Sequence, residues 1–195
     1  MGELRGGLRV HFALAAVLGG AALLCMASTW LPSGYTAPKW LISVLFVMVF
    51  PVFITALIRV VTSRGAARRR GRVGAGELGR CILLLPPAVR LAYALALGAA
   101  VLGFATASGT ARDVQADATG YHYTYWDKSA QPQQSRTVEL TEPEYDAALR
   151  SQFRVFSAAP ALFFTLSSFL VLVSASAGAA KRRAAQPPEV GPAAG

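Results

Sequence analysis

The stretch from Trp40 to Ile58 reads WLISVLFVMVFPVFITALI and contains no charged side chain. A hydrocarbon core about 30 Å thick is crossed by about 20 apolar residues in a helix, because each residue rises about 1.5 Å. Inside lipid every backbone amide has to bond within the protein, and an uninterrupted run of this length does so as a helix. The sequence therefore predicts a membrane-spanning helix here.

Three further stretches of similar length lack charged residues, so the chain is predicted to cross the membrane four times. The predicted fold is an all-α integral membrane protein with four transmembrane helices. A small extracytoplasmic β-hairpin plus helix is expected between spans 3 and 4. The predicted organisation is a cytoplasmic N-terminus (1–9), span 1 (10–31), span 2 (40–61), a basic cytoplasmic loop (62–86), span 3 (87–111), an extracytoplasmic hairpin and amphipathic helix (112–156), span 4 (157–180) and a disordered cytoplasmic tail (181–195).

The composition agrees with a membrane protein, since 54% of the residues are hydrophobic and only 15% are charged. Soluble domains carry roughly 25% charged residues. The net charge of +9 is unevenly distributed: the segments predicted to be inside hold 13 basic and 3 acidic residues, and those outside hold 6 and 7. Attraction to anionic headgroups accounts for this excess. No recognition helix or interleaving of aromatic residues points to a nucleic-acid partner.

Arginine and lysine also predict the orientation, because short loops rich in them stay on the cytoplasmic side. An even number of crossings then places both termini on that side. The 16 Arg, 3 Lys and absence of Asn are typical of a GC-rich bacterial genome, so we expect a multi-pass protein of the bacterial cytoplasmic membrane. The residues that carry the orientation signal are Arg64, Arg68, Arg69, Arg70, Arg72, Lys181, Arg182 and Arg183.

Small residues predict how the spans pack, because helices in lipid associate through close approach of their backbones. Spans 1, 3 and 4 carry small residues spaced by four. These are Ala15 with Gly19 and Ala16 with Gly20 in span 1, Ser174 with Gly178 in span 4, and two rows in span 3, namely Ala92, Ala96, Ala100 and Ala99, Gly103, Ala107. We expect these three spans to pack together and the bulkier span 2 to face lipid or a partner. None of the ten acidic residues lies within a span, which disfavours a proton-coupled transporter.

The extracytoplasmic segment contains the unusual run YHYTYW, Tyr121 to Trp126. Its alternation predicts a strand with the three tyrosines on one face, and 136–140 predicts a second strand, which together form a hairpin. Thr141 and Glu144 have the spacing of a capping box that opens a helix. This helix is expected to run to, or nearly into, the fourth span.

The aromatic strand has two interpretations: packing within a tiny extracytoplasmic domain, or an exposed recognition surface. We expect a non-enzymatic protein that holds or senses a partner through this segment, the partner being another membrane or extracytoplasmic protein or a second copy. The alternative is a small transporter or pore formed between helices 1, 3 and 4. The candidate partner-binding residues are Tyr121, Tyr123, Tyr125 and Trp126.

A membrane-bound enzyme is the least favoured alternative. His122 stands alone between tyrosines, and no recurring nucleophile motif surrounds it. His11 and His122 are the two histidines of the chain, which argues against a metal site built from His and Cys ligands. We therefore expect no catalytic residues, no cofactor and no metal.

The charge pattern predicts that tags fused to both termini are protected from a membrane-impermeant reagent in intact cells and become reactive after lysis. A tag in the segment 112–156 is the control and is expected to react in intact cells. Reaction of the terminal tags in intact cells would reject the predicted topology.

Overall fold

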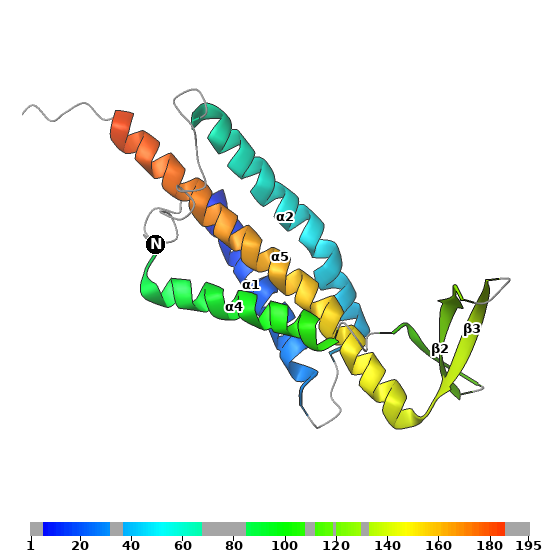
Figure 1. Cartoon of the computed structure of the whole chain (residues 1–195). Coiled ribbons are helices and arrows are strands. Elements are labelled where there is room, and N and C mark those ends of the chain that lie inside the picture. The colour runs from blue at the N-terminus through cyan, green and yellow to red at the C-terminus, as the bar shows by residue number, and fades with distance from the viewer. Residues whose placement is uncertain are drawn as a thin grey trace, which may run out of the picture.

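The structure is a computed structural model, and it describes residues 6–31, 37–67, 85–107, 112–118, 120–129 and 133–185. It consists of long helices and a small antiparallel sheet (Figure 1). The elements are α1 (Gly7–Ser28), α2 (Lys39–Ala67), α4 (Pro87–Ala107), β1 (Val114–Asp117), β2 (Gly120–Asp127), β3 (Gln134–Leu140) and α5 (Glu142–Ala185).

The helices α1, α2, α4 and α5 are each long and apolar enough to cross a membrane. The prediction of four helices of membrane-spanning length is confirmed, and their length and composition are compatible with a multi-pass membrane protein. The helix ends differ from the predicted boundaries by a few residues. α2 extends to Ala67, into the predicted loop, and α5 extends to Ala185, past the point where a disordered tail is predicted.

α5 is the central helix of the bundle. It has 44 residues, and at 1.5 Å per residue it is about 66 Å long, roughly twice the thickness of a hydrocarbon core. Its membrane part packs extensively on α1, α2 and α4, whereas those three helices contact one another only slightly. Its first turns continue beyond the bundle to the sheet (Figure 1). We call the two ends of the bundle the sheet end and the loop end, the latter being where α1 begins.

α2 packs on α5 through a bulky stripe, which corrects the expectation that span 2 faces only lipid or a partner. Its buried residues recur at helical spacing, and ring contacts extend the interface. Phe53 lies edge-on to Phe163 with ring centroids 5.1 Å apart, and Phe46 contacts Phe156 in the same way at 6.2 Å. The buried stripe of α2 consists of Ile42, Leu45, Val49, Val52, Ala56 and Val60.

Small residues on α1 and α4 allow close approach, but mainly toward α5 rather than toward each other. A Cβ atom placed on Gly19 would lie 3.3 Å from the Cβ of Phe164. On α4 the buried residues are Ala100, Gly103 and Ala107, which mixes the two predicted rows of small residues. Sequence spacing therefore identified the buried face of α1, where Ala15 and Gly19 lie, but not that of α4.

The sheet has three strands in the order β1-β2-β3, whereas the sequence predicted a two-stranded hairpin. β1 pairs antiparallel with the first half of β2, and Val114 lies opposite Tyr123. The strand escaped prediction because its four residues, VQAD, include one large apolar side chain and show too little alternation. Val114 is nevertheless buried, so pairing and packing, not propensity, define this strand.

The close approach of α4 to its neighbours predicts the effect of enlarging Gly103. A Cβ at this position would meet the Met26 sulfur and would lie 3.1 Å from the Cβ of Ala158. We expect Gly103→Leu to lower the free energy of unfolding by about 1–3 kcal/mol through overpacking. The readout is the unfolding midpoint of the detergent-solubilised protein.

Gly98→Leu is the matched control for this prediction. It lies on the same helix, and a Cβ there would meet no atom within 4 Å. The gain in helix propensity from replacing Gly is common to both variants, so their difference isolates packing. Equal midpoints for the two variants would contradict the close α4 contact.

Candidate functional site

One face of the sheet is apolar and carries the three tyrosines of β2. Residues directly opposite each other in an antiparallel pair point to the same face. On β3, Leu140 lies opposite Tyr121 and Val138 lies opposite Tyr123. On β1, the strand on the other side of β2, Val114 also lies opposite Tyr123. This register agrees with the predicted alternation of the strand.

Tyr121 and Tyr123 are engaged in contacts within the protein. The Tyr121 ring stacks on Tyr145 of α5, with ring centroids 4.5 Å apart and an interplanar angle of 26°. The guanidinium of Arg112 lies 4.3 Å from the centroid of the Tyr123 ring. An aromatic pair contributes about 0.5–1.5 kcal/mol beyond its buried area. These two tyrosines therefore attach the sheet to α5 and to the segment that precedes β1.

Tyr125 and Trp126 project from the far end of β2 and are 42% and 57% exposed. Successive residues of a strand point to opposite faces, so Trp126 lies on the face opposite the tyrosines. Its indole N–H donates to the side-chain oxygen of Gln133 at 3.3 Å. The structure thus divides the four candidate residues into two that pack internally and two that are exposed.

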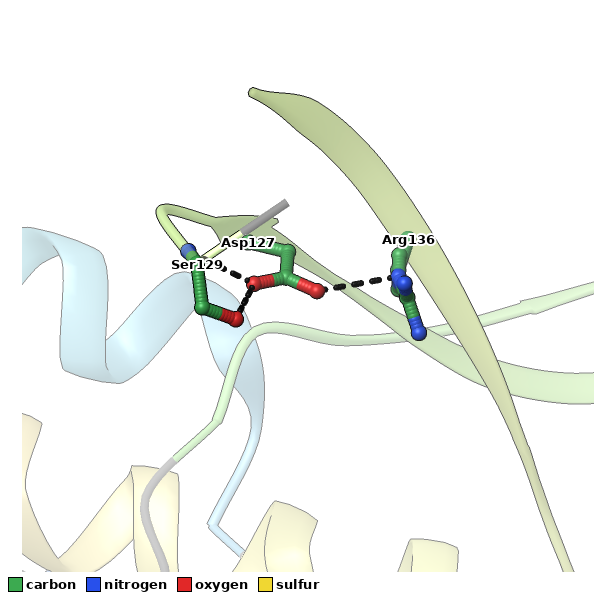
Figure 2. A network of polar contacts seen from close by, with 3 residues as sticks. All are labelled: Asp127, Ser129 and Arg136. Atoms are coloured by element: carbon green, nitrogen blue, oxygen red, sulfur yellow. Dashed lines mark hydrogen bonds and ion pairs between the residues drawn. The ribbon is translucent and has the colours of Figure 1, made fainter. Parts of the chain in front are cut away.

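A charged network braces this end of the sheet (Figure 2). One carboxylate oxygen of Asp127 accepts hydrogen bonds from the backbone N–H and the hydroxyl of Ser129, at 2.9 and 2.6 Å. The other oxygen lies 3.0 Å from the Nε of Arg136, which is opposite Tyr125 on β3. The Asp127 side chain is only 13% exposed, so this ion pair is partly shielded from solvent. It joins the ends of β2 and β3 where the two aromatic side chains project.

The junction between β3 and α5 contains half of the predicted capping box. The Glu144 carboxylate accepts from the backbone N–H of Thr141 at 2.9 Å, and from its hydroxyl at 2.7 Å. The hydroxyl therefore donates to Glu144 instead of accepting from the helix. The backbone and then the side-chain hydrogen bond of Thr141 hold the pKa of Glu144 below its usual value. This pair orients the sheet relative to the first, charged turn of α5.

Arg154 joins three helices at the sheet end of the bundle. Its Nε donates to the Thr29 hydroxyl at 3.1 Å and its Nη1 donates to the carbonyl of Thr106 at 3.4 Å. Its guanidinium also lies 5.1 Å from the centroid of the Trp30 ring. One turn earlier on α5, the hydroxyl of Ser151 donates to the carbonyl of Ala107 at 3.3 Å. We call these six residues the sheet-end junction.

Electrostatic attraction explains why a cation lies at the sheet-end junction. α1 ends at Ser28 and α4 is described as far as Ala107, and the last turn of a helix carries partial negative charge. A cation that reaches both ends stabilises them together. Sequence reasoning missed Arg154, because its role requires two helix ends that are distant in the chain.

The residues of the predicted orientation signal fall mostly outside the part of the chain that the structure describes. Arg64 lies in α2 and 181–183 lie in α5, but their side chains lie outside the part that is described. The residues Arg68, Arg69, Arg70 and Arg72 lie outside it altogether. Their role in topology stays a prediction.

His122 lies on the face of the sheet opposite the tyrosines, and its Nδ1 is 3.9 Å from the nearer carboxylate oxygen of Asp117. Within the described ranges, no three His, Cys, Asp or Glu side chains gather as metal ligands. The expectation that the protein is not an enzyme stays a prediction.

A groove of about 410 Å³ lies between α1, α4 and α5. It coincides with the place where the sequence predicted a pathway between spans 1, 3 and 4. Small side chains line two of its walls, Ala16 and Gly20 on α1 and Ala92 and Ala96 on α4. The sequence predicted that these small residues bring helices into close contact, but in the structure they line the groove.

Comparison with protein families, with curated proteins and with solved structures finds no match to this chain. Its function has to be argued from its own residues.

The sheet-end junction predicts a specific loss of stability. Replacing Arg154 by Met keeps an unbranched, flexible side chain but removes two hydrogen bonds and the contact of the guanidinium with Trp30. We expect the free energy of unfolding to fall by about 1–3 kcal/mol, because the Thr29 hydroxyl and the Thr106 carbonyl lose the donor that Arg154 provides. The measurement is the unfolding midpoint of the detergent-solubilised Arg154→Met protein, compared with that of the wild type.

Arg150→Met is the matched control for this prediction. Arg150 lies one turn earlier on α5, and its Nε donates to the Asp146 carbonyl of its own helix at 3.3 Å. If Arg150→Met lowers the midpoint as much as Arg154→Met does, Arg154 has no special role in joining the helices.

Proposed function

We propose that the protein is a non-enzymatic membrane protein that holds or senses a partner through its sheet, and that Tyr125 and Trp126 are the contact residues. The observation that carries this proposal is the exposure of both side chains, 42% and 57%, at a braced end of the sheet. Tryptophan and tyrosine are enriched among the residues that dominate binding energy. Their rigid rings lose little conformational freedom when a partner covers them.

The polar network that holds the end of the sheet in place supports a binding role for Tyr125 and Trp126 over a purely structural role. The Asp127 carboxylate connects to Ser129 and Arg136 (Figure 2), and Asp127 directly follows Trp126 in β2. A surface that is held in place before binding pays a smaller ordering cost when it binds. Internal packing of the sheet uses Tyr121 and Tyr123, and Tyr125 adds a tilted ring contact with Tyr123 at 6.1 Å while staying exposed.

Continuity of α5 supports a sensing role. Tyr121 stacks on Tyr145 in the first turns of this helix, and the same helix then enters the bundle and contacts α1, α2 and α4. A displacement of the sheet would therefore act on one continuous helix that reaches the loop end. We propose that the sheet lies outside the cell, that both termini lie in the cytoplasm and that the membrane is the cytoplasmic one, as the basic loop predicts.

A small transporter is the second candidate, and the groove between α1, α4 and α5 favours it. The residues that line the groove include no charged side chain, which suits an apolar solute better than an ion. Gly20→Leu fills the groove, so it would abolish solute flux in proteoliposomes if this second candidate is correct.

The proposed binding role predicts that Trp126→Ala weakens partner binding. Residues of this kind contribute about 2 kcal/mol or more at an interface, which corresponds to roughly 30-fold weaker binding. The measurement is quantitative recovery of the partner with the full-length protein purified in detergent after crosslinking in cells. Tyr125→Ala is expected to act in the same direction.

Trp40→Ala is the matched control for this prediction. Trp40 is 67% exposed, but it lies at the start of α2 and not on the sheet. A reproducible partner that is lost with Trp126→Ala and kept with Trp40→Ala supports the proposal. Equal recovery with both variants, or no crosslinked partner from the sheet at all, rejects it. A crosslinked dimer identifies a second copy as the partner.

A further inference from the structure

The groove between α1, α4 and α5 is built to remain open within the membrane. Gly20 and Ala16 line it from α1, and Ala92 and Ala96 line it from α4. α1 and α4 contact each other only slightly, while each packs on α5. Because these side chains are small and the two helices stay apart, a volume of about 410 Å³ is left between them. That volume lies within the range of small-molecule sites.

The polar groups of the groove bond to one another, so they do not require a polar ligand. The hydroxyls of Tyr93 and Ser168 lie 2.8 Å apart, and Ser168 in turn donates to the carbonyl of Thr165 at 2.8 Å. The Thr165 hydroxyl donates to the carbonyl of Ala161 at 2.7 Å. With Ser168 donating to Thr165, Tyr93 is the donor of the first bond, and all three O–H groups are used. The remaining lining is apolar, which favours a hydrocarbon occupant.

Arg9 supplies a positive charge at the loop end of the groove. It precedes Phe12, a lining residue, by three positions and therefore lies on the same side of α1, one turn closer to the start of the helix. Its side chain is exposed. A guanidinium at the level of the headgroups matches the geometry and charge of a phosphate. Charge and lining therefore point to one occupant with an anionic head and an apolar chain.

We propose that this groove binds one acyl chain of an anionic phospholipid and that Arg9 contacts the lipid phosphate. The lipid fills the space that the small residues of α1 and α4 leave between them. A transmembrane helix of a second copy would also cover these residues, but it would bring no anion to Arg9. A polar solute would find no unsatisfied hydroxyl donor among Tyr93, Thr165 and Ser168.

The test uses the full-length protein, delipidated in detergent and then incubated with phosphatidylglycerol or phosphatidylcholine of the same acyl chains. Native mass spectrometry counts the lipid retained by each molecule. The wild-type protein is expected to retain phosphatidylglycerol in preference to phosphatidylcholine. Gly20→Leu, which fills the groove, is expected to reduce retention of phosphatidylglycerol by about tenfold or more.

Gly98→Leu is the matched control for the groove. A Cβ on either Gly20 or Gly98 would meet no atom within 4 Å, but only Gly20 lines the groove. Arg9→Gln is expected to abolish the preference for the anionic lipid, and Arg9→Lys is expected to restore part of it. If Gly20→Leu does not fold, Ala92→Leu blocks the groove from the opposite wall.

Three results would overturn the proposal. The first is equal lipid retention by Gly20→Leu and Gly98→Leu. The second is an unchanged lipid preference in Arg9→Gln. The third is a dimer in the wild-type protein that Gly20→Leu converts to a monomer while lipid retention stays the same, which would assign the groove to a second copy. None of these results bears on the role of Trp126.

Discussion

Packing against α5 holds the described structure together. α1, α2 and α4 each lie along this helix, and among the described residues they contact one another much less. In lipid the hydrophobic effect does not drive helices together, so association requires close contact over a long shared surface. α5 provides this surface by presenting a different face to each neighbour. Buried positions such as Ala161, Phe164 and Val171 recur along the helix because three partners cover it.

The three neighbours use different packing chemistry on the same helix. α2 contributes branched and aromatic side chains, as in the contact of Phe53 with Phe163. α1 and α4 contribute small residues, so Gly19 lies against Phe164 of α5 and Gly103 lies against both Met26 of α1 and Ala158 of α5. This arrangement leaves α1 and α4 apart at the groove, because the small side chains on their other faces do not meet.

Polar contacts supplement this packing at both ends of the bundle. At the sheet end, Arg154 bonds next to the ends of α1 and α4. At the loop end, Arg59 of α2 donates to the Gly7 carbonyl of α1 at 3.2 Å. Both arginines place their charged group near an end of the bundle, where the hydrocarbon gives way to water. The sheet lies beyond the helix bundle. It is joined to α5 by the ring stack of Tyr121 on Tyr145 and by the hydrogen bond from the Thr141 N–H to Glu144.

The number of spans, their approximate limits and the aromatic strand were predictable from the sequence, because they depend on local properties: run length, charge and alternation. The helix after Thr141 was predictable for the same reason. The faces that pack, the strand formed by 114–117 and the role of Arg154 were not, because each depends on residues that are far apart in the chain. The division of the aromatic run into packed Tyr121 and exposed Trp126 likewise follows from the position of Tyr145 and the neighbouring strands, and only the tertiary structure decides it.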